Sequence, residues 1–272
     1  MTWIPVGPAL LFCPADRPDR YRKAAAAADM VILDLEDGVS PPDRPGAREA
    51  LKATLLDPQR TIVRVNPFGT DDFSLDVAAL AQTPYSTVML AKTESVDDVN
   101  ALGPRPVIAL CETARGVLES ANIAAGASTV ALMWGAEDLV ASLGGRSSRT
   151  KSGDYRAVAT HARSQVLLAA RAHERAAIDA IHLDIVDVEG LRVEAEDAAA
   201  SGFCATACIH PSQVEVVRAA FRPTDEEIAW ASGVSKAAAS ERGVFSYQGR
   251  MIDAPLLRHA QQILHTVSRQ EP

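Results

Sequence analysis

The sequence of 272 residues contains no long hydrophobic run. No uninterrupted apolar stretch approaches the roughly 18 residues that a membrane-spanning helix requires. The apolar segment 3–13 contains Pro5, Gly7 and Pro8 and has no basic residue before it, so it does not fit the pattern of a signal peptide. We therefore expect a cytoplasmic protein with no membrane segment.

Positive charge is also in short supply. Lysine and arginine number 27 against 35 aspartate and glutamate residues, which gives a net charge of −8 and an isoelectric point near 5.3. General nucleic-acid binding requires a basic surface that displaces counterions from phosphates. The composition argues against a nucleic-acid partner, and an anionic small ligand would need a local basic patch.

Cysteine occurs at four positions, Cys13, Cys111, Cys204 and Cys208. All four lie in or beside apolar runs, which fits reduced core thiols in a reducing compartment. Cys204, Cys208 and His210 form a faint zinc-like pattern, but it has no fourth partner nearby and its spacing is not that of common zinc sites. Neither a disulfide framework nor a zinc site is predicted.

Hydrophobic residues, in contrast, make up 47% of the chain, which is enough for a sizeable core. Short apolar runs recur and alternate with helical patterns. The candidate strands are 9–13, 30–35, 61–65, 87–91, 107–111, 129–134, 180–185 and 205–209. The helical patterns include 21–28, 44–56, 74–81, 96–102, 115–125 and 155–174.

Near-continuous apolar strands that alternate with amphipathic helices indicate an α/β protein with a parallel sheet. Eight such units favour a closed (β/α)₈ TIM barrel over residues 1–222, and an open doubly wound sheet is the alternative. Residues 223–272 exceed what a barrel needs. We expect them to form a C-terminal helical extension, with a helix over 225–242 and a tail over 245–269.

Polar side chains follow nearly every predicted strand at the point where it ends. They include Asp16, Arg17, Glu36, Asp37, Arg64, Asn66, Lys92, Glu112, Thr113, Glu137, Asp138, Asp184, Asp187, His210 and Gln213. In a TIM barrel the active site is built at the carboxyl ends of the strands. So many charged and amide groups exceed what helix capping requires, so we predict an active site there.

Glu112 and Asp138 follow two successive strands of the predicted barrel. Two such carboxylates suit one Mg²⁺, which takes one or two protein carboxylates and keeps positions for water and substrate oxygens. The alternative for each acid is a helix cap or a surface ion pair.

Two groups of basic residues are candidates for binding anions. Arg64 lies between Val63 and Val65, so its side chain points to the opposite face, and its forked guanidinium suits a carboxylate if that face is the barrel interior. The alternative is an arginine that neutralises Glu36 or Asp37. The second group comprises Arg17, Arg20, Arg22 and Lys23, which suit phosphates or, alternatively, form a solvated helix start.

Eight segments, in order, resemble the citrate lyase β-subunit-like branch of the HpcH/HpaI aldolase family. They are LLFCPADRPDRYRKA, VILDLEDGVSPPDRPGAR, VRVNPFGT, VMLAKTES, CETARGVLE, MWGAEDL, CIHPSQ and MIDAPLLRHA. The resemblance covers about residues 9–265. It implies a (β/α)₈ barrel, a homotrimer or hexamer, Mg²⁺, and cleavage or formation of a carbon–carbon bond in acyl-CoA thioesters.

The resemblance also implies roles for particular residues. Glu112 and Asp138 would be the Mg²⁺ ligands, Arg64 would hold the oxo-acid end of the substrate, and Glu36 and Asp37 would orient the waters of the metal. In the tail motif MIDAP, Asp253 would reach the site of a neighbouring subunit as an acid/base. Arg17, Arg20 and Lys23 are predicted to hold the phosphates of CoA.

Three functions agree with these residues. The first is a stand-alone Mg²⁺-dependent lyase that acts on a malyl-, citramalyl- or hydroxymethylglutaryl-type CoA thioester. The second is a thioesterase that hydrolyses malyl- or citramalyl-CoA on the same scaffold. The third is a citrate lyase β subunit whose thioester is carried by a partner acyl-carrier protein.

Overall fold

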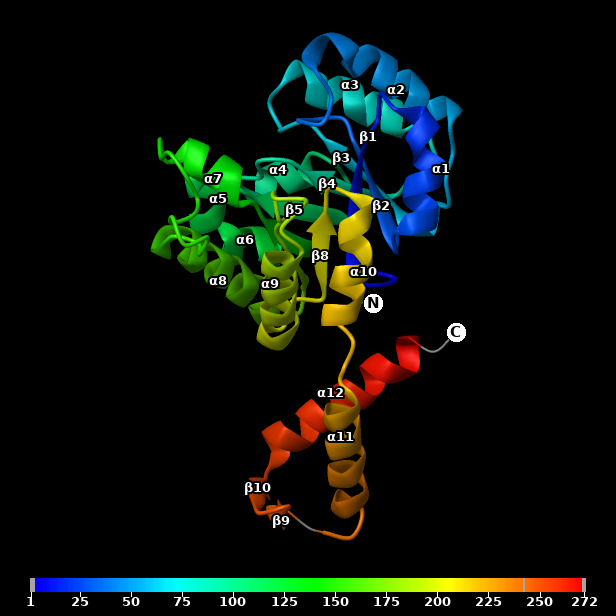
Figure 1. Cartoon of the computed structure of the whole chain (residues 1–272). Helices are drawn as coiled ribbons and strands as arrows, with labels where there is room; N and C mark the ends of the chain where they lie inside the picture. Colours follow the sequence, from blue (N-terminus) through cyan, green and yellow to red (C-terminus); the bar gives the residue numbers. More distant parts are fainter. Residues whose placement is uncertain (1–2, 242, 271–272) are drawn as a thin grey trace. The chain divides into compact units, whose positions relative to one another are not determined.

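The computed structural model describes residues 3–241 and 243–270. The chain divides into two compact units, Met1–Arg218 and Ala219–Pro272 (Figure 1). None of the helices described is long and apolar enough to cross a membrane.

The first unit is a closed barrel of eight parallel strands, which confirms the predicted TIM barrel. The strands are β1 (Ala9–Pro14), β2 (Met30–Asp34), β3 (Thr61–Val65), β4 (Thr87–Leu90), β5 (Val107–Cys111), β6 (Thr129–Trp134), β7 (Ala176–Asp179) and β8 (Ala205–Cys208). Each pairs with its neighbours in the chain, and β1 pairs with β8 to close the barrel.

Helices connect successive strands around the barrel (Figure 1). They are α1 (Pro18–Ala27), α2 (Arg44–Ala53), α3 (Asp71–Leu80), α4 (Val96–Asn100), α5 (Ala114–Leu118), α6 (Ser120–Ala125), α7 (Ala136–Ser142), α8 (Ala157–Ala172) and α9 (Val188–Ser201), and α10 (Pro211–Ala220) follows β8. Short 3₁₀ turns lie at Pro41–Asp43 and Pro58–Arg60.

Every second residue of the strands fills the barrel interior. Ile32, Ile62 and Leu110 belong to one buried cluster. Because side chains alternate along a strand, the residues two positions later face the same interior at the carboxyl end. These residues are Asp34, Arg64 and Glu112, so the hydrophobic alternation itself carries three charged groups into the mouth of the barrel.

The strand predicted over 180–185 is wrong, because β7 lies just before it at Ala176–Asp179. The sequence AAID is fully buried but rich in alanine, which has little preference for strands. Leu183 and Ile185, which suggested a strand, are 49% and 41% exposed in the loop after β7. The predicted helix over 115–125 is divided into α5 and α6 at Glu119.

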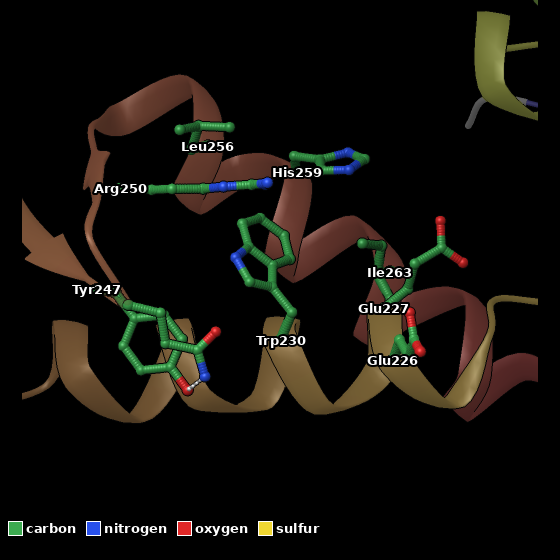
Figure 2. A pocket seen from close by; sticks show the side chains of 9 residues that line it. Glu226, Glu227, Trp230, Tyr247, Arg250, Leu256, His259 and Ile263 are labelled. Atoms are coloured by element: carbon green, nitrogen blue, oxygen red, sulfur yellow. Dashed lines mark hydrogen bonds between the residues drawn. The ribbon is translucent and has the colours of Figure 1, made fainter.

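The second unit contains α11 (Asp225–Ala238), a hairpin of β9 (Phe245–Tyr247) and β10 (Arg250–Ile252), and α12 (Ala254–Gln270). Thr224 and Glu227 form a capping box that starts α11. The helix expected over 225–242 ends at Ala238, and Arg242 lies outside the described residues. Aromatic and basic side chains, among them Trp230, line a cavity of about 580 Å³ (Figure 2).

Candidate active site

A cavity of about 260 Å³ opens at the carboxyl ends of the barrel strands. Its charged lining residues are Asp34, Arg64, Glu112, Glu137 and Asp138. Its apolar lining residues include Phe12, Leu110, Met133, Trp134, Ile181 and Ile209. The cavity combines oxygen donors and one guanidinium with an apolar wall, which suits a small anion that also carries carbon groups.

Glu112 and Asp138, the two predicted metal ligands, line this cavity together. Glu112 directly follows β5 and is 2% exposed, whereas Asp138 lies in the first turn of α7 with a third of its side chain exposed. A Cβ atom at Gly135 would lie 2.7 Å from Glu112 Oε2, so glycine leaves the space that this carboxylate occupies. Burial, and next the charge of Asp138, raise the pKa of Glu112 to about 8.

Arg64 points into the barrel, as the alternation of β3 predicted. Its Nε and Nη2 each donate to one oxygen of Asp34 at 2.7 Å, and its Nη1 lies 3.2 Å from Glu36. The guanidinium also stacks over the ring of Phe12, 4.8 Å from the centroid. Burial opposes the charge of Arg64, but Asp34 raises its pKa above the usual value, so the guanidinium stays charged.

Asp34 is the site residue that the sequence did not reveal. It ends β2 two positions after Ile32, and it accepts from the backbone N–H groups of Glu36 and Gly38 at 3.0 and 2.8 Å. A Cβ atom at Gly38 would lie 2.3 Å from Asp34 Oδ2, so the turn requires glycine. Because Asp34 stands inside the apolar run MVILDL, only its period of two with Ile32 could have indicated an inward-facing acid.

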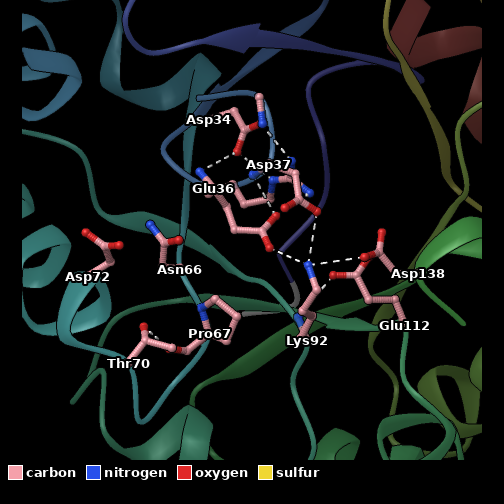
Figure 3. A network of polar contacts seen from close by, with 12 residues as sticks. Asp34, Glu36, Asp37, Asn66, Pro67, Thr70, Asp72, Lys92, Glu112 and Asp138 are labelled. Atoms are coloured by element: carbon pink, nitrogen blue, oxygen red, sulfur yellow. Dashed lines mark hydrogen bonds and ion pairs between the residues drawn. The ribbon is translucent and has the colours of Figure 1, made fainter. Parts of the chain in front are cut away.

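Lys92, two residues after the end of β4, lies at the centre of the polar network in Figure 3. Its ammonium contacts Glu36, Asp37 Oδ2 at 3.0 Å and Asp138 Oδ1 at 3.2 Å. Its backbone N–H donates to Glu112 Oε1 at 3.1 Å. Lys92 therefore connects the candidate metal ligands to the acids that follow β2.

The acids that follow β2 differ in the direction of their pKa shifts. Burial raises the pKa of Glu36. Burial also opposes the charge of Asp37, but the hydrogen bond and charge of Lys92, together with the charge of Arg64, lower the pKa of Asp37. Burial also opposes the charge of Lys92, but Glu36 raises the pKa of this ammonium above its usual value. Lys92 therefore stays charged among the carboxylates.

Negative charge at the mouth exceeds positive charge. The carboxylates are Asp34, Glu36, Asp37, Glu112 and Asp138, and the cations in contact with them are Arg64 and Lys92. The described residues contain no cluster of three or more His, Cys, Asp or Glu side chains arranged to hold a metal. Mg²⁺ needs only one or two protein carboxylates, so the carboxylate oxygens and the net negative charge at the mouth fit Mg²⁺.

The predicted phosphate-binding residues lie outside the cavity lining. Arg17 pairs with Asp19 at 3.3 Å before α1, and Arg20 and Lys23 are exposed along α1. Asp253 belongs to the second unit, where its Oδ1 accepts from the backbone N–H of Leu256 at 3.2 Å at the start of α12. The structure thus brings together five of the predicted residues, namely Glu36, Asp37, Arg64, Glu112 and Asp138.

The aromatic wall of the cavity is held from outside. Trp134 Nε1 donates to Asp179 Oδ1 at 2.5 Å, and Arg163 donates to the same carboxylate. Tyr155 meets Trp134 edge to face, with ring centroids 5.2 Å apart. These contacts fix the indole against the barrel and so fix the shape of the cavity.

Comparison with known proteins identifies three relatives that each match more than nine-tenths of this chain. The citrate lyase subunit beta-like protein of Mycobacterium tuberculosis is 60% identical over 258 residues, which are 95% of this chain and 94% of the relative. The mitochondrial citramalyl-CoA lyase of Rattus norvegicus is 31% identical over 94% of this chain and 84% of its own. The (3S)-malyl-CoA thioesterase of Cereibacter sphaeroides is 31% identical over 94% of this chain and 93% of its own.

The same relationship holds in three dimensions. The crystal structure of protein CitE from Mycobacterium tuberculosis in complex with magnesium, acetoacetate and coenzyme A matches with a TM-score of 0.93 at 60% identity, over 96% of this chain and 98% of that chain. The model of the HpcH/HpaI aldolase/citrate lyase family matches residues 9–104 and 101–211. The chain therefore belongs to the HpcH/HpaI aldolase/citrate lyase family.

Proposed function

We propose that the protein is a Mg²⁺-dependent carbon–carbon lyase that converts a β-hydroxyacyl-CoA thioester into an acyl-CoA and an oxo-acid. The observation that carries this proposal is the pair Glu112 and Asp138, which share an electron-rich cavity with the guanidinium of Arg64. A 60% identical relative binds magnesium, acetoacetate and coenzyme A together, and a 31% identical relative is a citramalyl-CoA lyase.

In this proposal Glu112 and Asp138 hold Mg²⁺, and Glu36 and Asp37 orient its waters. The bound metal supplies Lewis-acid polarisation of a substrate oxygen. Nε and Nη2 of Arg64 bind Asp34, and Nη1 lies beside Glu36. A substrate carboxylate would replace Glu36 as the partner of Nη1. Its charge stabilises the carboxylate of the oxo-acid.

Cleavage requires one proton to leave and another to arrive. The hydroxyl of the substrate gives its proton to solvent water, the bond between the α and β carbons breaks, and the β carbon becomes the carbonyl of the oxo-acid. The electron pair remains on the acyl-CoA as an enolate, which is then protonated at its α carbon. We assign this protonation, and the reverse removal of the α proton, to Asp253.

The CoA part of the substrate needs a cationic surface near the mouth. Arg17, Arg20 and Lys23 follow β1 at the carboxyl end of the barrel, where the active site opens. Arg20 and Lys23 are exposed, and Arg17 has only a weak partner in Asp19 at 3.3 Å. We assign the phosphates of CoA to these three side chains.

A substrate screen tests the function. Purified protein with Mg²⁺ is incubated with free malyl-, citramalyl- and hydroxymethylglutaryl-CoA, and the products are identified by mass spectrometry. We expect an acyl-CoA and an oxo-acid, and we expect EDTA to stop their formation. Heat-denatured protein in the same buffer is the control.

The same screen separates the alternatives. Release of free CoA and a hydroxy diacid would instead establish a thioesterase, the activity of the 31% identical malyl-CoA thioesterase relative. Inactivity on every free CoA ester, with activity on the same acyl group attached to a carrier protein, would instead establish a citrate lyase β subunit.

We further propose a homotrimer in which Asp253 completes the site of a neighbouring subunit. If so, inactive Glu112→Gln protein mixed with inactive Asp253→Asn protein should regain about a quarter of the wild-type activity, because random mixing pairs an intact barrel with an intact tail at that frequency. Subunit exchange is verified by native mass spectrometry of differently tagged chains.

A mixture of Glu112→Gln with Asp138→Asn is the matched control, because both changes damage the same barrel site and no combination restores it. Exchange without any recovery in the Asp253→Asn mixture would place the complete site in one chain.

A further inference from the structure

Lys92 is the residue of the site whose role is still unassigned. It touches both proposed metal ligands, Asp138 through its ammonium at 3.2 Å and Glu112 through its backbone N–H at 3.1 Å. Its ammonium donates hydrogen bonds to Glu36 and Asp37 and forms an ion pair with Asp138. Of its three carboxylate partners, Asp138 is held by charge alone.

The backbone of Lys92 is unusual as well. Its φ of 48° lies in the left-handed region, which residues other than glycine and asparagine rarely adopt. This turn directs the N–H of Lys92 to Glu112, which follows the next strand, and directs its side chain across the mouth to the acids after β2 (Figure 3). Strained conformations of this kind persist where the surrounding contacts determine them, often in functional sites.

We infer that the ammonium of Lys92 pairs with Asp138 when no metal is bound and competes with Mg²⁺ for this carboxylate. The inference rests on the proposed function, because it takes Glu112 and Asp138 as the metal ligands. When Mg²⁺ binds, the ammonium gives up Asp138 and remains on Glu36 and Asp37. Lys92 thereby sets the affinity of the site for the metal, as a positioning residue.

Two charges explain the sign of the effect. An ammonium next to Asp138 repels a dication that binds the same carboxylate, and at a separation of a few ångströms this repulsion outweighs thermal energy even when it is strongly screened. Removal of the ammonium leaves Glu36, Asp37 and Asp138 without their shared counterion. The metal-free site then becomes more negative and attracts Mg²⁺ more strongly.

The test is a Mg²⁺ titration of the full-length, EDTA-stripped protein by isothermal calorimetry without substrate. Lys92→Met keeps the length of the side chain and removes its charge, and we expect its Kd for Mg²⁺ to fall by about tenfold. Lys92→Gln, which retains a donor for Glu36, should bind Mg²⁺ more tightly as well. Lys92→Arg retains the charge and should stay within about threefold of the wild type.

Lys52→Met is the matched control, since it removes a lysine from a surface pair with Glu49 on α2. Thermal melting adds a second readout: Mg²⁺ should raise the Tm of Lys92→Met by more than it raises the Tm of the wild type. A Kd for Lys92→Met and Lys92→Gln that equals or exceeds the wild-type Kd would overturn the inference. Absence of Mg²⁺ binding by the wild type would overturn the proposed function itself.

Discussion

Replacement of Glu112 by glutamine is expected to lower Mg²⁺-dependent turnover by on the order of 1,000-fold while it stabilises the metal-free barrel. Glutamine has the shape of glutamate, so the space beside Gly135 is still filled, and its amide oxygen still accepts from the N–H of Lys92. It removes one of two carboxylates that we assign to the metal. The variant therefore loses the cation without losing the fold.

The gain in stability follows from the pKa of Glu112, which burial raises from 4.5 to about 8. A carboxyl with a raised pKa holds its proton more tightly in the folded state, so the folded state loses stability as the pH rises from about 4.5 toward 8. Glutamine does not titrate and avoids this loss. In EDTA, the variant should melt a few degrees above the wild type at pH 8.5 and at nearly the same temperature at pH 4.5.

Calorimetric melts at the two pH values, with and without Mg²⁺, measure this effect beside the assay of turnover. Mg²⁺ should raise the Tm of the wild type and leave that of Glu112→Gln unchanged. Full turnover by the variant, or an equal Mg²⁺-induced shift in both proteins, would remove Glu112 from the metal site.

The period of two in the strands made much of this site predictable. Glu112 follows an apolar run and Arg64 lies within one, and the alternation that buries Ile62 and Leu110 places both side chains in the barrel mouth. Asp34 obeys the same rule but is hidden inside an apolar run. The geometry of Lys92 depends on a left-handed backbone that no residue type in the sequence announces.

Other failures have different physical origins. The sequence predicts strand β7 over 180–185, after its true position, because two of the four residues of β7 are alanine. The larger apolar side chains that follow β7 are exposed in a loop. The hydrophobic pattern shows where apolar residues occur along the sequence but not which of them are buried. A short alanine-rich strand beside an exposed apolar loop is therefore not recognised from the pattern. The role proposed for Asp253 stays a prediction, because it involves a neighbouring chain and the pattern of one chain does not specify an assembly.

Arg64→Lys should lower kcat/KM by on the order of 100-fold although it preserves the positive charge. The guanidinium makes two parallel hydrogen bonds to Asp34 and directs a third nitrogen toward Glu36. An ammonium is a single point on a flexible stem and cannot reproduce the two parallel hydrogen bonds of the guanidinium. Loss of one of the two hydrogen bonds to the buried Asp34 should also lower the free energy of unfolding by about 2 kcal/mol.

Because stability and activity would fall together, the prediction needs a control in which only stability falls, and Arg48→Lys provides it. Arg48 is 7% exposed and binds Asp72 and Asp76, but it does not line the active-site cavity. Chemical denaturation should show similar losses of stability in the two variants, whereas assays well below their melting temperatures should show a large loss of kcat/KM in Arg64→Lys alone. Equal losses of kcat/KM would mean that Arg64 acts through the fold, and the substrate carboxylate would then require another partner.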